Sequence, residues 1–144
     1  MAKQWRTPRT SLQVGTSAYA QGDALGVKLG LAVPEWGKIR SIILTDVDDE
    51  ASTTVNVWIF ESEPTGIAAN AAFALADADL ELVMAVRLID QEFDAINGRV
   101  KFEDCNIPYR AVGGNLWVQC ELEGSATPTY ATTDDVKIQL FTEA

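Results

Sequence analysis

Residues 115–123, NLWVQCELE, alternate strictly between two kinds of side chain. One set is Leu116, Val118, Cys120 and Leu122, and the other is Trp117, Gln119, Glu121 and Glu123. A period of two is that of a β-strand with one face packed on a core. We therefore predict a strand here, with its aliphatic face turned inward and Trp117 turned outward.

Seven further segments show strand-like patterns and are separated by turn residues. They lie at 11–14, 24–32, 38–47, 53–62, 80–89, 98–105 and 135–141. Short period-two segments joined by turns are typical of antiparallel sandwiches and barrels. We interpret residues 104–114, which contain Pro108, as a structured loop.

The alanine-rich stretch PTGIAANAAFALADADL, residues 64–80, interrupts this series. It is too long for a hairpin loop and too apolar for a disordered one. We expect an ordered crossover near 65–78 with a short helical turn, capped by Asn70 or Thr65. A connection of this length favours jelly-roll or Greek-key order over a simple meander. The predicted fold is all-β: an antiparallel β-sandwich, jelly-roll or Greek-key like.

The chain has 144 residues and a formal net charge of −10, yet its first ten residues hold Lys3, Arg6 and Arg9 and no acid. We divide it into a basic N-terminal arm, residues 1–12, and a single β-sandwich domain, residues 13–144. The arm is either a frayed terminus or a tether with Trp5 as its apolar anchor.

The charge and hydropathy patterns also exclude classes of partner. The acidic remainder lacks the broad cationic surface that phosphate contacts need, so we expect no nucleic acid. Charges interrupt every apolar stretch before about 18 residues, so we expect no membrane partner. The first residues lack the apolar region of a signal peptide, and we expect no export by that route.

The sequence contains no histidine, which removes the commonest general base and the commonest metal ligand. A Ser-Lys arrangement is not excluded, but nothing points to one, and we expect no catalytic residues and no enzyme. The acidic clusters at 46–50 and 77–81 group oxygen ligands, but the first lacks the glycine and the spaced ligands of a calcium loop. We interpret it as a solvated turn, with a weak divalent-cation site bridging subunits as the alternative, and we expect no metal and no cofactor. Cys120 is predicted to be a buried free thiol, with a Cys105–Cys120 disulfide as the alternative.

Two segments far apart in the chain share a pattern. SAYAQGDALGVKL (17–29) and PTYATTDDVKIQL (128–140) both contain Tyr-Ala, two residues, an Asp, one residue and an aliphatic. Tyr19 and Asp23 thereby match Tyr130 and Asp134. Either this is chance, or two strands are entered by similar corners at which the tyrosines pack. The second interpretation predicts that the two tyrosines are neighbours.

Trp58, Trp117, Tyr109 and Tyr130 are the aromatic side chains available to a sugar-binding face. Packing in a core or a subunit interface is the commoner use of such residues. An outward Trp117, together with Trp58 and Phe60, leaves a monomer with poorly buried aromatic surface. We therefore favour a homo-oligomer.

Four segments carry a resemblance to a known class of protein. They are SAYAQGDALG (17–26), GKIRSIILTDVDDE (37–50), VNVWIFESEPTGIAANAAFALADADL (55–80) and ATPTYATTDDVKIQL (126–140). Together they resemble small virion structural proteins of tailed bacteriophages, especially head-decoration (cement) proteins with a β-sandwich fold. The shared features include the lead-in Tyr19-Gly22-Asp23, a strand ending at Pro64 and a closing segment that begins at Pro128.

The resemblance implies a homo-oligomer, commonly a homotrimer, that binds the phage major capsid protein on the capsid exterior after assembly in the host cytoplasm. It implies no catalytic residues. As contacts to the capsid or to other subunits we predict Lys3, Trp5, Arg6, Arg9 and Trp117. As corner and packing residues we predict Tyr19, Asp23, Tyr130 and Asp134. The alternative function is a glycan- or receptor-binding module of a phage tail or fibre.

Overall fold

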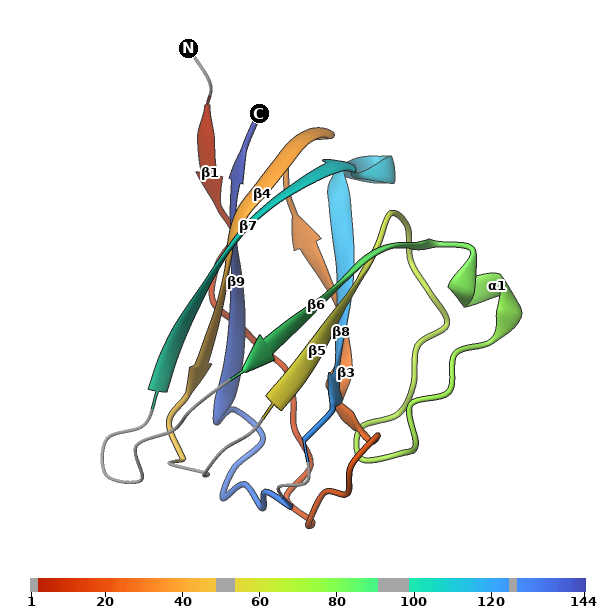
Figure 1. The fold of residues 1–144 in the computed structure, drawn as a ribbon, viewed down its shortest axis with the longest axis vertical. Coiled ribbons are helices and arrows are strands. Elements are labelled where there is room, and N and C mark those ends of the chain that lie inside the picture. Colours follow the sequence, from red (N-terminus) through yellow and green to blue (C-terminus); the bar gives the residue numbers. More distant parts are fainter. Residues whose placement is uncertain (1–2, 49–53, 91–98, 125–126) are drawn as a thin grey trace.

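The computed structural model describes residues 3–48, 54–90, 99–124 and 127–144. Within them, two antiparallel sheets pack face to face (Figure 1). Sheet I contains β1 (Gln4–Arg6), β2 (Thr10–Ser11), β4 (Trp36–Asp46), β7 (Arg99–Arg110) and β9 (Val136–Glu143). Sheet II contains β3 (Ala24–Ala32), β5 (Thr54–Phe60), β6 (Val83–Asp90) and β8 (Asn115–Leu122). A helical turn, α1 (Asp77–Leu80), and a 3-10 turn, η1 (Val112–Gly114), complete the described elements.

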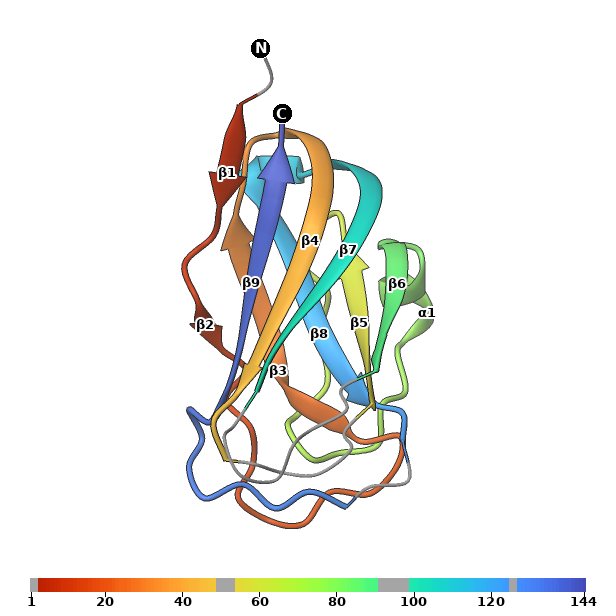
Figure 2. The ribbon, with the colours of Figure 1, turned by 60° about the vertical axis from the view of Figure 1, so that its left-hand side comes forward.

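The strand pairs are nested along the chain. β5 pairs with β6, β4 with β7, β3 with β8, and both β1 and β2 with β9. The spatial orders are β1-β9-β4-β7 in sheet I and β3-β8-β5-β6 in sheet II (Figure 2). A long hairpin rolled into two facing sheets gives this nesting, which is the jelly-roll arrangement. The predicted antiparallel sandwich of jelly-roll order is therefore confirmed.

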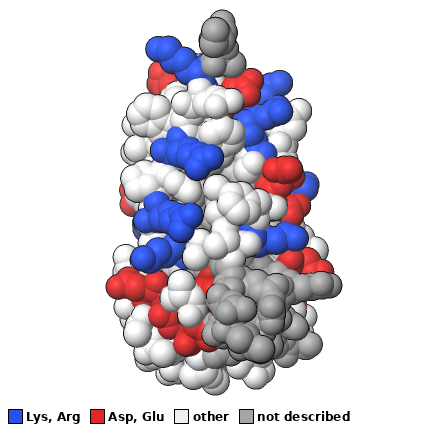
Figure 3. All heavy atoms as spheres, turned by 90° about the vertical axis from the view of Figure 1, so that its left-hand side faces the viewer, with Lys and Arg blue, Asp and Glu red and all other residues white. Residues whose placement is uncertain are grey.

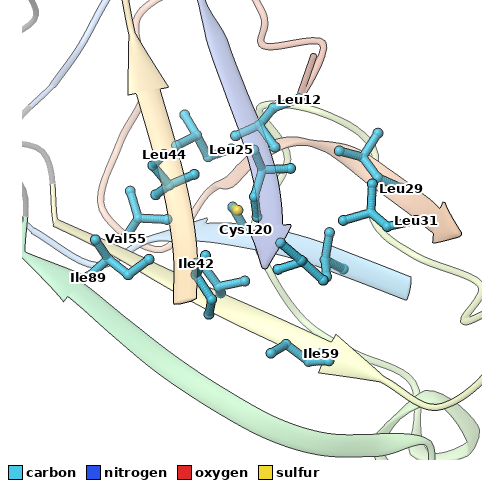
Figure 4. Packing of buried hydrophobic residues seen from close by; sticks show 14 of the residues in the cluster. Leu12, Leu25, Leu29, Leu31, Ile42, Leu44, Val55, Ile59, Ile89 and Cys120 are labelled. Atoms are coloured by element: carbon cyan, nitrogen blue, oxygen red, sulfur yellow. The ribbon is translucent and has the colours of Figure 1, made fainter. Parts of the chain in front are cut away.

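The core lies between the sheets and is built from the inward positions of both. On β8 the alternation places Leu116, Val118, Cys120 and Leu122 inward, and all four are buried. Figure 4 shows Cys120 among aliphatic side chains from β3, β4, β5 and β6. Burying an aliphatic side chain of this size stabilises the fold by about 1.5–3 kcal/mol relative to leaving it exposed.

The connection between β5 and β6, residues 61–82, is ordered, but its helix lies later than predicted. The helical turn begins at Asp77, after an N-cap at Ala76 that makes no side-chain hydrogen bond. Neither Asn70 nor Thr65 caps it. Asn70 instead has a positive φ of 64°, and its side-chain amide donates to Ser17 O and Ala18 O. An Asn tolerates this left-handed conformation better than most residues, which suits it to a turn.

Residues 104–110 are strand rather than the predicted loop, because β7 continues to Arg110. Pro108 lies opposite Lys38 of β4. β7 is the last strand of sheet I, so Pro108 has no second partner strand that would need its missing N–H. Only residues 111–114 form the turn into β8.

Residues 4–6 and 10–11, predicted as part of a basic arm, are edge strands of sheet I. β1 and β2 both pair with β9. Leu12 follows in the core, and its N–H donates to Val136 O at 2.9 Å. The two ends of the chain therefore run side by side, as Figure 1 shows.

Candidate functional site

The predicted corner tyrosines meet at one end of the sandwich. The rings of Tyr19 and Tyr130 lie edge to face with centroids 6.0 Å apart, and both are buried. Tyr19 N–H donates to Pro128 O, and Gly15 N–H donates to the Tyr19 hydroxyl at 2.7 Å. Burial raises the pKa of the Tyr19 hydroxyl. This corner closes the core and offers no open binding surface.

The acid that repeats the role of Asp23 is Asp135 rather than Asp134. Asp23 Oδ2 accepts from the N–H of Ala20, three residues earlier. Asp135 accepts in the same way from the N–H of Thr132 at 2.9 Å and from its hydroxyl at 2.6 Å. Burial raises the pKa of Asp135, but these hydrogen bonds outweigh it and the net shift is downward. Asp134 is exposed.

The predicted arm contacts lie along the edge of sheet I. The Trp5 indole N–H donates to Ala32 O at the end of β3, and the ring remains half exposed. The Arg6 guanidinium lies 5.1 Å from the centre of the Phe141 ring. Lys3 exchanges backbone hydrogen bonds with Ala144, and Arg9 is exposed between β1 and β2.

Trp117 lies apart from these residues, on the outer face of sheet II. Its ring packs on Gly30, where a Cβ atom would approach it to 3.0 Å. Lys28 Nζ lies 5.7 Å from the ring centre, and the same amine binds Glu63 Oε1 and Pro64 O. Trp117 therefore contacts its own chain and is half-buried.

We call residues 61–82 the covering segment, because they cross the outer face of sheet II. Gln119 points outward from β8 but is fully buried beneath them. Its amide donates to Ile67 O at 2.7 Å and to Gly26 O at 3.3 Å, and accepts from Ile67 N–H. Trp58 packs against Phe73 with ring centres 5.4 Å apart. The buried Asp79 accepts from the N–H groups of Thr65 and Gly66, which fixes the segment's start.

Sheet I presents a different outer face, which we call the basic face. It consists of Arg6, Trp36, Lys38, Arg40, Ser41, Ile43, Val100, Phe102, Asp104, Arg110, Lys137, Gln139, Phe141 and Glu143. These residues lie opposite one another across the strands and alternate with inward residues. Trp36 and Phe102 are 61% and 60% exposed, and Val100 is 45% exposed. Within the described chain, large aromatic side chains are therefore exposed on this face, whereas the exposed large apolar side chains on sheet II are Val86 and Leu88 of β6.

A β-bulge in β4 determines which residues reach this face. Ile39 and Ile42 are both in the core, so the two residues between them both lie on the outer side. The pairing of β4 with β9 shifts register between Ile39 and Ser41, which accommodates Arg40 as the extra residue. Strict alternation through 38–47 would have placed Ile39 and Ile42 on opposite faces.

The exposure of Phe102 follows from the second half of β7. Cys105, Ile107 and Tyr109 pack on or in the core, so the alternation turns Val100 and Phe102 outward. The opposite side of the strand carries Glu103, which Arg87 of β6 binds at 2.8 Å. At this point the inward side of β7 therefore carries an ion pair, where an apolar side chain would ordinarily be buried.

The basic face carries five of the described cations, Arg6, Lys38, Arg40, Arg110 and Lys137. Among the lysines and arginines that the structure describes, only Lys28 and Arg87 lie on strands of sheet II. Figure 3 shows Lys and Arg side chains spread along this side of the molecule, with uncharged and acidic ones among them. The face holds two acids. Asp104 accepts from Ser41 Oγ, and Glu143 lies 3.9 Å from Arg40.

Sequence reasoning missed Trp36, Arg40, Phe102 and Arg110. The Arg110 guanidinium lies 5.0 Å from the centre of the Trp36 ring, although the two residues are far apart in the chain. Only the pairing of β4 with β7 brings them together. The sequence signal was limited to two apolar residues, Val100 and Phe102, alternating with charged ones.

The remaining site predictions concern cysteines and metals. Both Cys105 and Cys120 are free, so the disulfide alternative is wrong. Burial raises the pKa of the Cys120 thiol to about 12. Among the described residues, no group of three or more Cys, Asp or Glu side chains is placed to hold a metal ion. Asp49 and Glu50 of the first acidic cluster lie outside the described residues.

Comparison with protein-family models and with curated protein sequences finds no match to this chain. In the part of the chain that the structure describes, no helix has the length and apolar character needed to cross a bilayer.

Proposed function

We propose that this chain is a structural protein of a tailed-phage virion, a decoration or cement protein that binds the capsid exterior as a homo-oligomer and stabilises the shell. The observation that carries the proposal is the uncovered basic face. Its exposed aromatic and arginine side chains are of the kinds enriched at the centres of protein interfaces. The proposal assigns no catalytic step to the chain.

The fold supports this function by analogy. Jelly rolls recur in viral capsid proteins and in lectins, and a fold alone does not establish a function. The resemblance of residues 17–26 and 126–140 to decoration proteins favours the capsid role over the lectin role.

The arrangement of aromatic residues weighs against the glycan-binding alternative. Tyr109 and Tyr130 are buried, and Trp58 and Trp117 contact the covering segment and Lys28. A sugar platform needs an exposed ring face. Of the aromatic residues first considered for that role, none is among the exposed ones in the described chain.

Co-sedimentation with empty shells tests the proposal. The shells are assembled from the major capsid protein of the same phage, and the full-length chain is added in excess. We expect the chain to sediment with expanded shells and to raise their unfolding temperature. Sedimentation velocity of the free chain should show a species larger than a monomer. A monomeric chain that fails to bind shells would overturn the proposal.

A further inference from the structure

We infer that the basic face docks against an acidic protein surface, in which Asp and Glu side chains surround an apolar side chain. The inference rests on the proposed function, since it names the chemistry of the surface to which the chain attaches. Three observations support it: the excess of cations on the face, the exposed apolar residues between them, and the poor fit of other occupants.

The cations exceed the acids on the basic face. The cations are Arg6, Lys38, Arg40, Arg110 and Lys137, and the acids are Asp104 and Glu143. Each acid already has a neighbour within the face, since Asp104 accepts from Ser41 and Glu143 lies near Arg40. The face is therefore locally cationic on a chain whose net charge is −10. Complementary charge on the partner steers encounter and fixes orientation.

An apolar patch lies among these cations. Phe102 is paired across the strands with Ile43, which is only 3% exposed, and Val100 follows on the same side of β7. Trp36 lies farther along the face, at the start of β4, with the Arg110 guanidinium 5.0 Å from its ring centre. An exposed Phe on a well-supported sheet is suited to contact an apolar side chain of the partner. The partner surface is therefore acidic but not uniformly charged.

A second copy of this chain fits the basic face poorly. A symmetric contact would set this cationic face, with Lys38, Arg40 and Lys137, against the same cationic face of the second copy. Like charges in such a contact are costly. The oligomer of the proposed function would then be formed through other surfaces.

Nucleic acid also fits less well than an acidic protein. Phosphate contacts favour a continuous cationic surface, whereas Asp104 and Glu143 lie within this one. Val100 and Phe102, which are exposed, also interrupt the cationic surface with apolar side chains. DNA binding is therefore the competing outcome of the test.

The first experiment uses acidic polypeptides as probes for the full-length chain. The probes are poly-L-glutamate, a random copolymer of Glu and Tyr, and a single-stranded DNA oligonucleotide. We expect the copolymer to bind more tightly than poly-L-glutamate, because its aromatic groups can reach Phe102. Binding should weaken as ionic strength rises from about 0.05 M to about 0.15 M. Tighter binding of the DNA than of either polypeptide would overturn the inference.

Matched variants locate the binding surface. The double variant Lys38→Gln/Lys137→Gln should weaken polypeptide binding about fivefold. The control is Lys101→Gln, which removes one charge from the same sheet. Lys101 is paired with Leu44 on the inward side, so this variant should bind nearly as tightly as wild type. Phe102→Ser should remove the preference for the copolymer, whereas Val86→Ser on sheet II should retain it. Equal binding by all variants would overturn the inference.

Shell binding by the same variants separates this inference from the proposed function. If every variant binds shells as wild type does, the proposed function stands and the docking face is wrong. If no form binds shells but the polypeptide results hold, the docking chemistry stands and the proposed function fails. If Lys38→Gln/Lys137→Gln instead dissociates the free homo-oligomer, the face is a contact between copies and the inference is wrong.

Discussion

The chain covers the outer faces of its two sheets to different extents. Sheet II is covered by residues 61–82, which enclose Gln119 and pack Phe73 against Trp58. Sheet I has no such cover within the described residues, and Trp36 and Phe102 remain largely exposed. The exposed large apolar side chains on sheet II are the aliphatic Val86 and Leu88 of β6, whereas the most exposed ones on sheet I are aromatic. The uncovered face is therefore the better candidate for a partner.

The largest expected effect is on the amide that holds the covering segment. Gln119→Ala removes three hydrogen bonds and leaves buried backbone groups of Ile67 and Gly26 without partners. We expect the free energy of unfolding to fall by about 3 kcal/mol. Urea unfolding followed by circular dichroism measures this.

The matched control for that variant is Gln139→Ala on sheet I. Gln139 also points outward, and its side-chain amide donates to Thr7 O at 2.7 Å. Its loss should cost about 1 kcal/mol. Equal effects of the two substitutions would mean that the covering segment is not held as described.

Two tryptophans give the next contrast. Trp58→Ala removes the contact with Phe73 and the hydrogen bond to Glu121, and should destabilise the fold by about 2 kcal/mol. Trp36→Ala removes an exposed side chain and should change stability by no more than about 0.5 kcal/mol. Thermal and urea unfolding of both variants provide the comparison. A large loss of stability in Trp36→Ala would assign that residue to the fold rather than to binding.

The closed end of the sandwich gives a smaller, pH-dependent effect. The folded pKa of Asp135 is lowered from 3.8, so the unfolded chain binds its proton more readily. Ionised Asp135 therefore stabilises the fold above about pH 4, and this contribution is lost as the pH falls from 3.8 through the folded pKa. Asp135→Asn should cost about 1 kcal/mol at neutral pH and reduce the dependence of stability on pH below 4.

Unfolding curves recorded between pH 2.5 and 7 test this, with Asp134→Asn as the control. Asp134 is exposed, and we expect its substitution to leave the acid dependence almost unchanged. If the pH dependence of stability is unchanged in Asp135→Asn, or is changed in Asp134→Asn, then Asp134 rather than Asp135 corresponds to Asp23, as the sequence pattern predicted.

The smallest effect on stability is expected at Phe102. Phe102→Ser replaces a side chain that is 60% exposed, so the free energy of unfolding should stay within about 0.5 kcal/mol of wild type. Shell binding, in contrast, should weaken roughly tenfold, the usual cost of losing a central aromatic contact. Unfolding and co-sedimentation on one preparation separate the two properties. A destabilised variant would show that Phe102 serves the fold.

The sequence predicted the fold because the alternation in 115–123 and 135–141 is regular and its aliphatic residues are all buried. It did not predict the basic face, for two physical reasons. The bulge at Arg40 changes the phase of alternation within one strand, and no residue pattern in 38–47 marks it. The cations of the face also come from both ends and the middle of the chain, and only strand pairing brings them together.

The same limit applies to the predicted contacts. The sequence predicted that Trp117 points outward, and the structure of β8 confirms this. The sequence could not show that Lys28 and Gly30 contact the Trp117 ring. The echo of Tyr19 and Tyr130 was informative because both segments close the same end of the core. At the acids, however, the sequence match was wrong by one residue. Asp23 and Asp135 each accept a hydrogen bond from the N–H three residues earlier, so Asp135 rather than Asp134 corresponds to Asp23.

Hydroxyl-radical footprinting of the full-length chain on shells would show which outer face docks. We expect oxidation of Trp36 and Phe102 to fall severalfold on binding, while oxidation of Trp58 and Leu88 on sheet II stays unchanged. Protection of Leu88 and Trp58, with Trp36 and Phe102 as reactive as in the free chain, would contradict it and would place the docking surface on sheet II.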